Sequence, residues 1–324
     1  MKNLDSVMIT GAAGFIGSHM SDKLLELGSK VIGIDNLSSG NIENLQNCND
    51  QNSFQLINED LKKSENFSSL LDDVDTIIHL AAYPEVRTGF ENPEISFREN
   101  IQNTYKFLEV IRKSNVKSIV FSSSSVVYGE PNSIPTSENY GPLLPISPYG
   151  GSKLACEGLI SSYCYNYGIE GTIVRFANVI GKRSNHGVIW DFIHKLKKNP
   201  KHLEVLGDGT QMKSYVHIDD CVLGILDSLN FTKNKVDVFN IGNDDQLDVL
   251  SIANIVSKQM ELSDAQIVLS GGTSDGRGWI GDVKKMKLDI SKLKSLGWKP
   301  NFSSKSAVEK ATSELLNEVN KIKS

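Results

Sequence analysis

A tyrosine and a lysine spaced four residues apart could together remove a proton from an alcohol. Tyr149 and Lys153 have this spacing, and a run of four serines, Ser122–Ser125, lies upstream. Residues at i and i+4 share one face of a helix. A free tyrosine has a pKa of about 10, and a nearby ammonium lowers it. We therefore predict that Tyr149 is a general base, that Lys153 lowers its pKa, and that Ser124 holds the substrate oxygen.

A glycine-rich motif near the start of the chain could hold a dinucleotide. Residues 10–17 read Thr-Gly-Ala-Ala-Gly-Phe-Ile-Gly, which places Gly11, Gly14 and Gly17 between a predicted strand and a predicted helix. Glycines there permit a tight turn and let backbone N–H groups and the helix N-terminus approach a pyrophosphate. The spacing is GxxGxxG rather than the GxGxxG of many dehydrogenases.

Asp35 indicates which dinucleotide binds. It ends the second predicted strand, 18 residues after Gly17, and residues 36–40 include no Arg or Lys. A carboxylate at this position accepts hydrogen bonds from the ribose hydroxyls and repels a 2′-phosphate. The sequence therefore favours NAD over NADP.

Other residues predicted to contact NAD follow the strands or belong to the motifs above. Asp60 and Leu61 follow the third strand and would lie at the adenine edge, and small residues follow the fourth strand, where a cofactor must pass. Lys153 would bond the nicotinamide ribose. The remaining members of the predicted cofactor set are Phe15, Ile16, Asn36, Ser38, Gly40, Leu80, Ala81, Ala82, Ser122 and Tyr149.

Strand-like and helix-like segments alternate through the first 175 residues, and this order predicts parallel βαβ units. We expect an α/β fold with a Rossmann-type, doubly wound parallel sheet. The predicted strands are Ser6–Thr10, Lys30–Ile34, Phe54–Ile57, Thr76–Leu80, Ser118–Phe121 and Gly171–Arg175. The predicted helices between them include Phe15–Leu27, Glu94–Ser114 and Pro148–Tyr167.

After residue 175 the pattern changes to glycine-containing loops and short elements. Helical patterns return at Val188–Lys197, Val249–Glu261 and Ser306–Lys321. We predict an NAD-binding domain over residues 1–175 and a smaller α/β substrate-binding region over 176–324. Residues 217–242 are expected to return to the first domain.

Composition excludes several classes of function. The chain has 324 residues, a net charge of −5 and 39% hydrophobic residues, which are ordinary values for a soluble globular protein without a basic surface for nucleic acid. No signal region precedes the first strand, and no apolar run approaches the roughly 20 residues of a membrane span. The four cysteines lack metal-type spacing, so we expect buried thiols, no metal site and a cytoplasmic location.

These motifs together resemble the extended short-chain dehydrogenase/reductase family, in particular its NAD-dependent nucleotide-sugar epimerases and dehydratases, and most of all the UDP-glucose 4-epimerases. The resemblance covers nearly the whole chain, and the order of the motifs makes it specific. The matching segments are TGAAGFIGSH, DNLSSG, HLAA, SSSSVVYG, SPYGGSK, RFANVIG, GDGTQMKSYVHIDD and RGWIGDV.

The resemblance implies roles for residues that spacing alone does not identify. Asn100 would be a structural and active-site asparagine beside the cofactor, and Asn178 would contact the sugar-nucleotide phosphates. Val188 would start the helix beside the uracil pocket. The remaining implied substrate contacts are Lys213 and Arg277, as phosphate cations, and Asp282, near the uridine ribose.

The sequence departs from the family pattern at several places, among them Gly151 in the Tyr-x-x-x-Lys helix, where the family often has Lys or Ala. Ser125 and Val126 stand where 4,6-dehydratases usually have Asp-Glu, the pair that eliminates water, so the resemblance argues against dehydration. Lys213 stands where the family often has arginine and lacks its bidentate fork. Arg277 precedes Asp282 by five residues, where related epimerases often have three.

The activity implied is inversion of C4 of a UDP-hexose, UDP-glucose or UDP-galactose, with or without an N-acetyl group, through a 4-keto intermediate and tightly bound NAD. The alternatives are UDP-glucuronate decarboxylase, a uronate 4-epimerase or another nucleotide-sugar oxidoreductase; a uronate would want an extra cation, for which Arg87 and Arg183 are candidates. A non-catalytic NAD-binding protein is a further alternative. Pocket volume near Ser124, Ser125 and Met286 would decide between hexose and N-acetylhexosamine.

The resemblance also implies a homodimer. The predicted helices Glu94–Ser114 and Pro148–Tyr167 would pair across a two-fold axis as a four-helix bundle. The partners expected from the sequence are therefore a UDP-sugar and a second copy of the chain, with no nucleic acid and no membrane.

Overall fold

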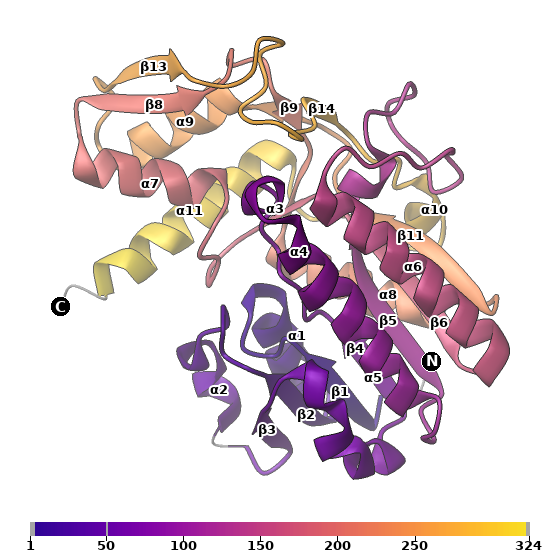
Figure 1. Ribbon diagram of the computed structural model, residues 1–324. Helices are drawn as coiled ribbons and strands as arrows, with labels where there is room; N and C mark the ends of the chain where they lie inside the picture. Colours follow the sequence, from indigo (N-terminus) through magenta and orange to yellow (C-terminus); the bar gives the residue numbers. More distant parts are fainter. Residues whose placement is uncertain (1–3, 50, 322–324) are drawn as a thin grey trace.

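The computed structural model describes residues 4–49 and 51–321, and its main feature is a seven-stranded parallel sheet (Figure 1). The strand order is β11-β6-β5-β4-β1-β2-β3, and every neighbouring pair is parallel. The predicted α/β class is confirmed. The strands are β1 (Ser6–Thr10), β2 (Lys30–Asp35), β3 (Phe54–Asn58), β4 (Thr76–His79), β5 (Ser118–Ser124), β6 (Glu170–Phe176) and β11 (Val236–Ile241).

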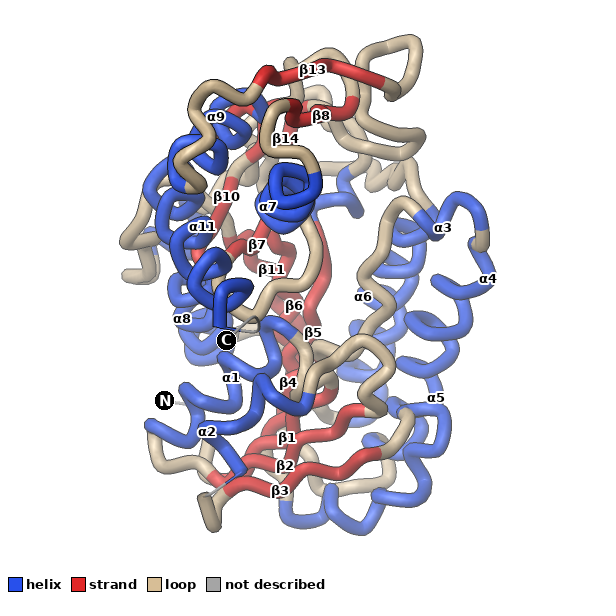
Figure 2. Tube along the Cα trace, turned by 90° about the vertical axis from the view of Figure 1, so that its left-hand side faces the viewer, coloured by secondary structure: helices blue, strands red, loops and turns tan. Residues whose placement is uncertain are grey.

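Helices cover both faces of this sheet (Figure 2). Helices α1 (Phe15–Glu26) and α8 (Ile218–Phe231) pack on one face, and α5 (Asn103–Ile111) and α6 (Pro148–Tyr167) pack on the other. Each layer buries its own apolar cluster against the strands, as the parallel sheet of a βαβ fold requires. The shorter connecting elements are η1 (Ile42–Leu45), α2 (Gln46–Asn49), η2 (Leu61–Asp73), α3 (Thr88–Glu91), η4 (Ser125–Tyr128) and α10 (Ser291–Ser295).

Helix α6 has the bounds that the sequence predicts because both of its ends carry strong signals. Ser147 accepts a hydrogen bond from Gly150 N at 3.1 Å, and Pro148 occupies the first helical position. Gly168 ends the helix in a left-handed conformation with φ +80°. The capped N-terminal turn of this helix carries Tyr149.

The predicted helix Glu94–Ser114 is divided into three consecutive segments: α4 (Pro93–Ser96), a π-helical turn η3 (Phe97–Gln102) and α5. The π turn inserts one extra residue per turn, and such turns often occur at functional sites. Here it contains Asn100, which is buried.

The C-terminal elements form a second layered unit beside the sheet's carboxyl ends (Figures 1 and 2). Helices α7 (Val188–Lys198), α9 (Val249–Gln259) and α11 (Ser304–Lys321) share an apolar cluster with β8 (His202–Leu206). Strand β8 pairs with β13 (Gln266–Ser270) in a parallel ribbon. The remaining short strands are β7 (Asn178–Ile180), β9 (Met212–Lys213), β10 (Tyr215–His217), β12 (Leu247–Asp248) and β14 (Lys285–Met286).

Two features of the second half bear on chain organisation. Strand β11 pairs with β6 at the edge of the main sheet, so the sheet contains a strand from the C-terminal half. The boundary expected at residue 175 falls inside β6. None of the helices in residues 4–49 and 51–321 has both the length and the apolar composition that a membrane span needs.

Candidate active site

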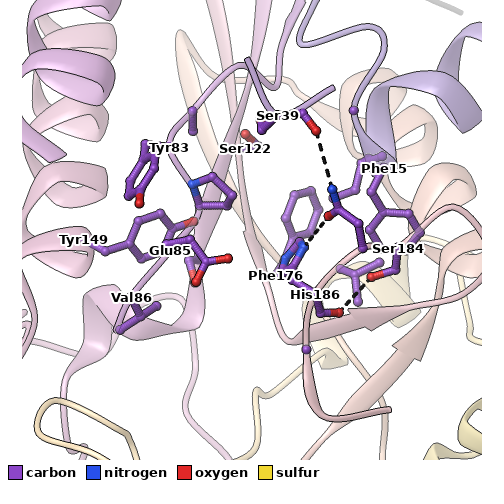
Figure 3. Close-up of a pocket in the computed structure, with 18 of the residues that line it drawn as sticks. Phe15, Ser39, Tyr83, Glu85, Val86, Ser122, Tyr149, Phe176, Ser184 and His186 are labelled. Atoms are coloured by element: carbon purple, nitrogen blue, oxygen red, sulfur yellow. Dashed lines mark hydrogen bonds between the residues drawn. The ribbon is translucent and has the colours of Figure 1, made fainter. Parts of the chain in front are cut away.

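One large cavity lies between the carboxyl ends of the parallel strands and the C-terminal elements, with a volume of about 1160 Å³. Pockets for one small ligand usually have about 300–1,000 Å³, so this space is large enough for a cofactor and a substrate together. Loops after β1, β2, β4 and β5 line it, which is where open α/β sheets bind ligands. Figure 3 shows Tyr83, Glu85 and Tyr149 on one wall, and Phe15, Ser184 and His186 on the opposite wall.

Two glycines of the glycine loop lie where neighbouring backbone leaves no room for a side chain. Gly11 has φ +74°, and an added Cβ would lie 2.9 Å from Ala81 N. At Gly17 an added Cβ would lie 2.0 Å from Gly11 O, so this glycine lets α1 pack on the loop. Helix α1 begins after Gly14 without a side-chain cap. Its first N–H groups are therefore available to an anion at the cavity.

Asp35 lines the cavity at the end of β2. Its Oδ2 accepts a hydrogen bond from Ala13 N at 2.9 Å, and its Oδ1 accepts one from Leu37 N at 2.8 Å. Burial raises the pKa of this carboxyl, while the two backbone hydrogen bonds lower it. Each carboxylate oxygen can accept a second hydrogen bond, so Asp35 keeps acceptor capacity for ribose hydroxyls.

Ser124, Tyr149 and Lys153 lie around one part of the cavity. Lys153 is buried, and its Nζ donates to Ser122 O at 2.8 Å and lies 5.9 Å from the centre of the Tyr149 ring. Ser124 caps η4 by accepting a long hydrogen bond from Val126 N, 3.4 Å. Its hydroxyl proton is therefore free to be donated to a ligand.

The pKa of Tyr149 differs from the sequence prediction. Burial raises the pKa of Tyr149, and burial lowers that of Lys153 to about 8. The prediction considered only the attraction between ammonium and phenolate, whereas the cavity wall desolvates both groups and favours their neutral forms. Ionisation of Tyr149 therefore requires further positive charge in the cavity.

A buried ion pair between Arg175 and Glu157 contacts the serine run through Ser123. Arg175 donates to both carboxylate oxygens of Glu157, at 2.9 and 2.7 Å, and Ser123 Oγ donates to the same carboxylate at 2.5 Å. Glu157 follows Lys153 by one turn of α6 and acts electrostatically to raise the pKa of that lysine. The network ties α6 to β5 and β6, and so fixes Ser124 relative to Lys153.

Asn100 acts as a bridge rather than as a cavity wall. Its side chain accepts from Tyr83 N at 2.7 Å and donates to Ser152 Oγ at 2.8 Å. It is absent from the residues that line the cavity. The π turn η3 thus connects the loop after β4 to the helix that carries Tyr149 and Lys153.

The predicted substrate residues differ in whether they line the cavity. Asn178, Val188, Lys213 and Asp282 line the cavity, and Lys213 Nζ pairs with Asp282 at 2.6 Å. Arg277 does not line it; its guanidinium pairs with Glu130 and Asp275, each at 2.6 Å, and donates to Asp282 O. All predicted cofactor residues except Asn100 line the cavity: Gly11, Gly14, Phe15, Ile16, Gly17, Asp35, Asn36, Ser38, Gly40, Asp60, Leu61, Leu80, Ala81, Ala82, Ser122, Tyr149 and Lys153.

Two cavity-lining side chains, Glu85 and Trp279, were not singled out by the sequence reasoning. Arg87 and Arg183, the two cations considered for a uronate, also line the cavity. The Arg87 guanidinium lies 5.0 Å from the centre of the Trp279 ring, and Arg183 pairs with Asp22 of α1 at 2.8 Å. Trp279 had a signal in the sequence, because it lies between Arg277 and Asp282, whose spacing departs from the family pattern.

The loop before α7 crosses the cavity toward the glycine loop. Asn185 Nδ2 donates to Ser39 O at 3.4 Å, and His186 hydrogen-bonds the Asn185 side chain at 3.0 Å (Figure 3). Together with the Arg183–Asp22 pair, these contacts join the C-terminal elements to the first two βα units. They enclose the part of the cavity beside Phe15.

The sequence profile of the NAD dependent epimerase/dehydratase family matches residues 7–242, and the chain belongs to this family. It is an enzyme whose cofactor is NAD.

Relatives are similar over almost the full length of this chain. A putative UDP-glucose 4-epimerase of Methanocaldococcus jannaschii is 37% identical, with 96% of this chain and 98% of the relative covered. A crystal structure of a UDP-galactose 4-epimerase has 40% identity and a TM-score of 0.86, with 97% and 99% covered. The UDP-glucuronic acid 4-epimerase of Bacillus cereus, in complex with UDP-glucuronic acid and NAD, has 32% identity and a TM-score of 0.87, again with 97% and 99% covered.

Proposed function

We propose that this enzyme inverts C4 of a UDP-hexose. The supporting observation is that Ser124, Tyr149 and Lys153 line the same cavity as the glycine loop, next to space for a second ligand. Relatives named as UDP-glucose and UDP-galactose 4-epimerases support the same reaction.

In the proposed mechanism, Tyr149 as phenolate takes the proton of the C4 hydroxyl while Ser124 donates a hydrogen bond to the same oxygen. When bound, NAD would supply the hydride acceptor and donor for C4, and its positive charge would favour the phenolate of Tyr149. Lys153 holds its ammonium between Ser122 O and the tyrosine ring. Tyr149 returns the proton when the carbonyl is reduced, so the net reaction consumes nothing.

Inversion requires that the 4-keto sugar present its other face, so the protein must hold the nucleotide firmly and the sugar loosely. We assign the grip on the nucleotide to Asn178, Lys213 and Asp282, with Val188 beside the base. Arg277 would act through Asp282, whose carbonyl accepts from it at 3.0 Å. Dehydration is not proposed, because Ser125 and Val126 supply no acid–base pair at the end of β5.

The test is incubation of the purified holoenzyme with UDP-galactose and, separately, UDP-N-acetylgalactosamine. Products are resolved by NMR while the absorbance of reduced nicotinamide is followed. A C4-inverted sugar without accumulation of reduced cofactor is expected, and the better substrate shows which hexose fits. Absence of inversion with both sugars, while UDP-glucuronate is inverted or decarboxylated, would replace this proposal with uronate chemistry.

We also propose that the enzyme is a homodimer that pairs through α6 and the neighbouring segment α4–η3–α5. Gly151, Ala155, Gly158 and Ser162 form a small-residue stripe on α6, and an added Cβ at either glycine would meet nothing within 4 Å. Glycine inside a helix costs about 1 kcal/mol relative to alanine, which close approach of a second helix would offset. Phe97 and Tyr105 are 57% and 47% exposed on the neighbouring segment.

Gly158→Leu tests the dimer, because the added side chain would hold the two copies of α6 apart. The variant is expected to sediment as a monomer while the wild type sediments as a dimer. Gly141→Leu is the matched control, since Gly141 is an exposed loop glycine with nothing within 4 Å of its added Cβ. A monomeric wild type would reject the proposal.

A further inference from the structure

Glu85 brings an unpaired carboxylate to the wall of the cavity that holds Tyr149. It lies in the loop after β4 and lines the cavity, and Figure 3 shows its side chain directed into the open space. Throughout residues 4–49 and 51–321, no group hydrogen-bonds or pairs with this carboxylate. A negative charge therefore faces the place where a ligand would meet Tyr149.

The loop that carries Glu85 is held on both sides. At its start, Tyr83 exchanges two hydrogen bonds with Asn100: Tyr83 N donates at 2.7 Å, and Tyr83 O accepts at 3.3 Å. At its end, the Arg87 guanidinium stacks 5.0 Å over the Trp279 ring. Glu85 lies between these two anchors, so its position is set by the fold.

No cation among the described residues pairs with Glu85. Arg87 lies in the same loop and lines the same cavity, and its guanidinium contacts the Trp279 ring. Lys213 pairs with Asp282 at 2.6 Å, and Arg183 pairs with Asp22 at 2.8 Å. Arg277 pairs with two carboxylates outside the cavity wall. The carboxylate of Glu85 thus keeps its acceptor sites for a ligand.

Binding of a sugar nucleotide would displace water from this carboxylate, which then needs donors from the ligand. The hydroxyl groups of a neutral hexose can donate, and hydrogen bonds to a charged acceptor are the stronger kind. A hexuronate would bring a second carboxylate into the same partly desolvated space, and like charges placed together across an interface are strongly disfavoured.

We propose that Glu85 is a specificity-determining residue that accepts hydrogen bonds from a neutral hexose and excludes hexuronates. The proposal rests on the proposed C4 epimerisation, because that reaction places the sugar beside Tyr149 and Ser124.

The experiment compares the holoenzyme with Glu85→Gln and Glu91→Gln. Gln keeps the shape of Glu85 without its charge, and Glu91 is an exposed carboxylate in α3 that does not line the cavity. Turnover of UDP-galactose and UDP-glucuronate is measured as kcat/KM, and dissociation constants are measured for both sugars and for UDP. In Glu85→Gln, the preference for UDP-galactose should fall by roughly 10- to 100-fold, with UDP binding unchanged. Glu91→Gln should leave the preference as it is.

Two outcomes would overturn the role of Glu85: a wild type that turns over UDP-glucuronate as well as UDP-galactose, or a variant that loses the same factor on both sugars. If the wild type inverts neither sugar, the epimerisation proposal fails on its own account. The binding measurements then test the role of Glu85 separately. Relative to UDP, Glu85→Gln must bind UDP-glucuronate more tightly than the wild type does.

Discussion

The two sides of the cavity are built by different means. On the cofactor side, backbone meets backbone: Gly11 and Gly17 pack against the neighbouring chain so closely that a methyl group would collide with it. On the sugar side, side chains meet across long stretches of sequence, as in the pairs Lys213–Asp282 and Arg87–Trp279. Ser124, Tyr149 and Lys153 lie where the two sides join.

The difference indicates how each side can change. A backbone cradle admits almost no substitution, whereas a wall made of paired side chains can change charge and shape while the fold persists. This fits the solved structures that share this fold, whose names include UDP-glucose, UDP-galactose and UDP-glucuronic acid 4-epimerases. We therefore expect substitutions on the cofactor side to affect folding and NAD binding, and those on the sugar side to affect substrate choice.

The largest effect is expected at Tyr149, where the cofactor side and the sugar side of the cavity join. Tyr149→Phe removes the proton acceptor and should lower kcat by about 10²–10⁴-fold with NAD binding and thermal stability unchanged. Tyr165→Phe on the same helix is the control, since Tyr165 is 67% exposed. Steady-state kinetics and the NAD content of the purified proteins make the comparison. Normal turnover by Tyr149→Phe would show that another group moves the proton.

The next effect concerns the pH dependence of stability. Burial lowers the pKa of Lys153 to about 8, below its ordinary value of 10.5. Between these two pH values the unfolded chain binds a proton that the folded chain does not, so the free energy of unfolding rises with pH there. The rise attributable to this group is on the order of 3 kcal/mol.

Lys153→Met should abolish that contribution. Urea unfolding of nucleotide-free wild type and variant, measured at neutral pH and near the upper end of the interval, gives the difference. Lys113→Met, a change at an exposed lysine in the turn after α5, should keep the wild-type dependence. Equal pH dependence in Lys153→Met and wild type would mean that the folded protein keeps Lys153 protonated throughout.

A smaller effect is expected from one methyl group in the glycine loop. In Gly17→Ala the added Cβ would lie 2.0 Å from Gly11 O, and only backbone movement can relieve that contact. We expect a loss of about 1–3 kcal/mol in the free energy of unfolding and loss of copurified NAD. Gly141→Ala, where nothing lies within 4 Å of the added Cβ, should change neither quantity. Retention of NAD by Gly17→Ala would contradict the expectation that substitutions on the cofactor side impair NAD binding.

The same distinction explains what the sequence could predict. The sheet, α1 and α6 follow from periodicity, glycine spacing and caps such as Ser147, which are local signals. The π turn at Asn100 was missed, because an inserted residue in a helix leaves the apolar pattern nearly unchanged. Glu85 and Trp279 were missed as cavity residues, because their loops have no periodicity and are placed by contacts with distant segments.

The smallest effect separates two cations on the sugar side. Lys213 lines the cavity and pairs with Asp282, whose side chain is 3% exposed, so Lys213→Met leaves a buried carboxylate unpaired beside the substrate. KM for the UDP-sugar should rise by about tenfold, equivalent to about 1.4 kcal/mol. Arg277 lies outside the cavity wall and pairs with the more exposed Glu130 and Asp275.

Arg277→Met should therefore raise KM by less than about threefold, because exposed ion pairs contribute little. Each of the two variants removes one positive charge, so a difference between their KM values reflects the positions of the two cations. Dissociation constants for UDP, measured beside KM, show whether the loss falls on the nucleotide or on the sugar. If Arg277→Met had the larger effect, the loop before Asp282 would have to rearrange on binding and bring that guanidinium to the phosphates. The sugar side would then be a wall that is completed only when substrate enters, in contrast to the cofactor side, where the glycine loop is already packed against its neighbours.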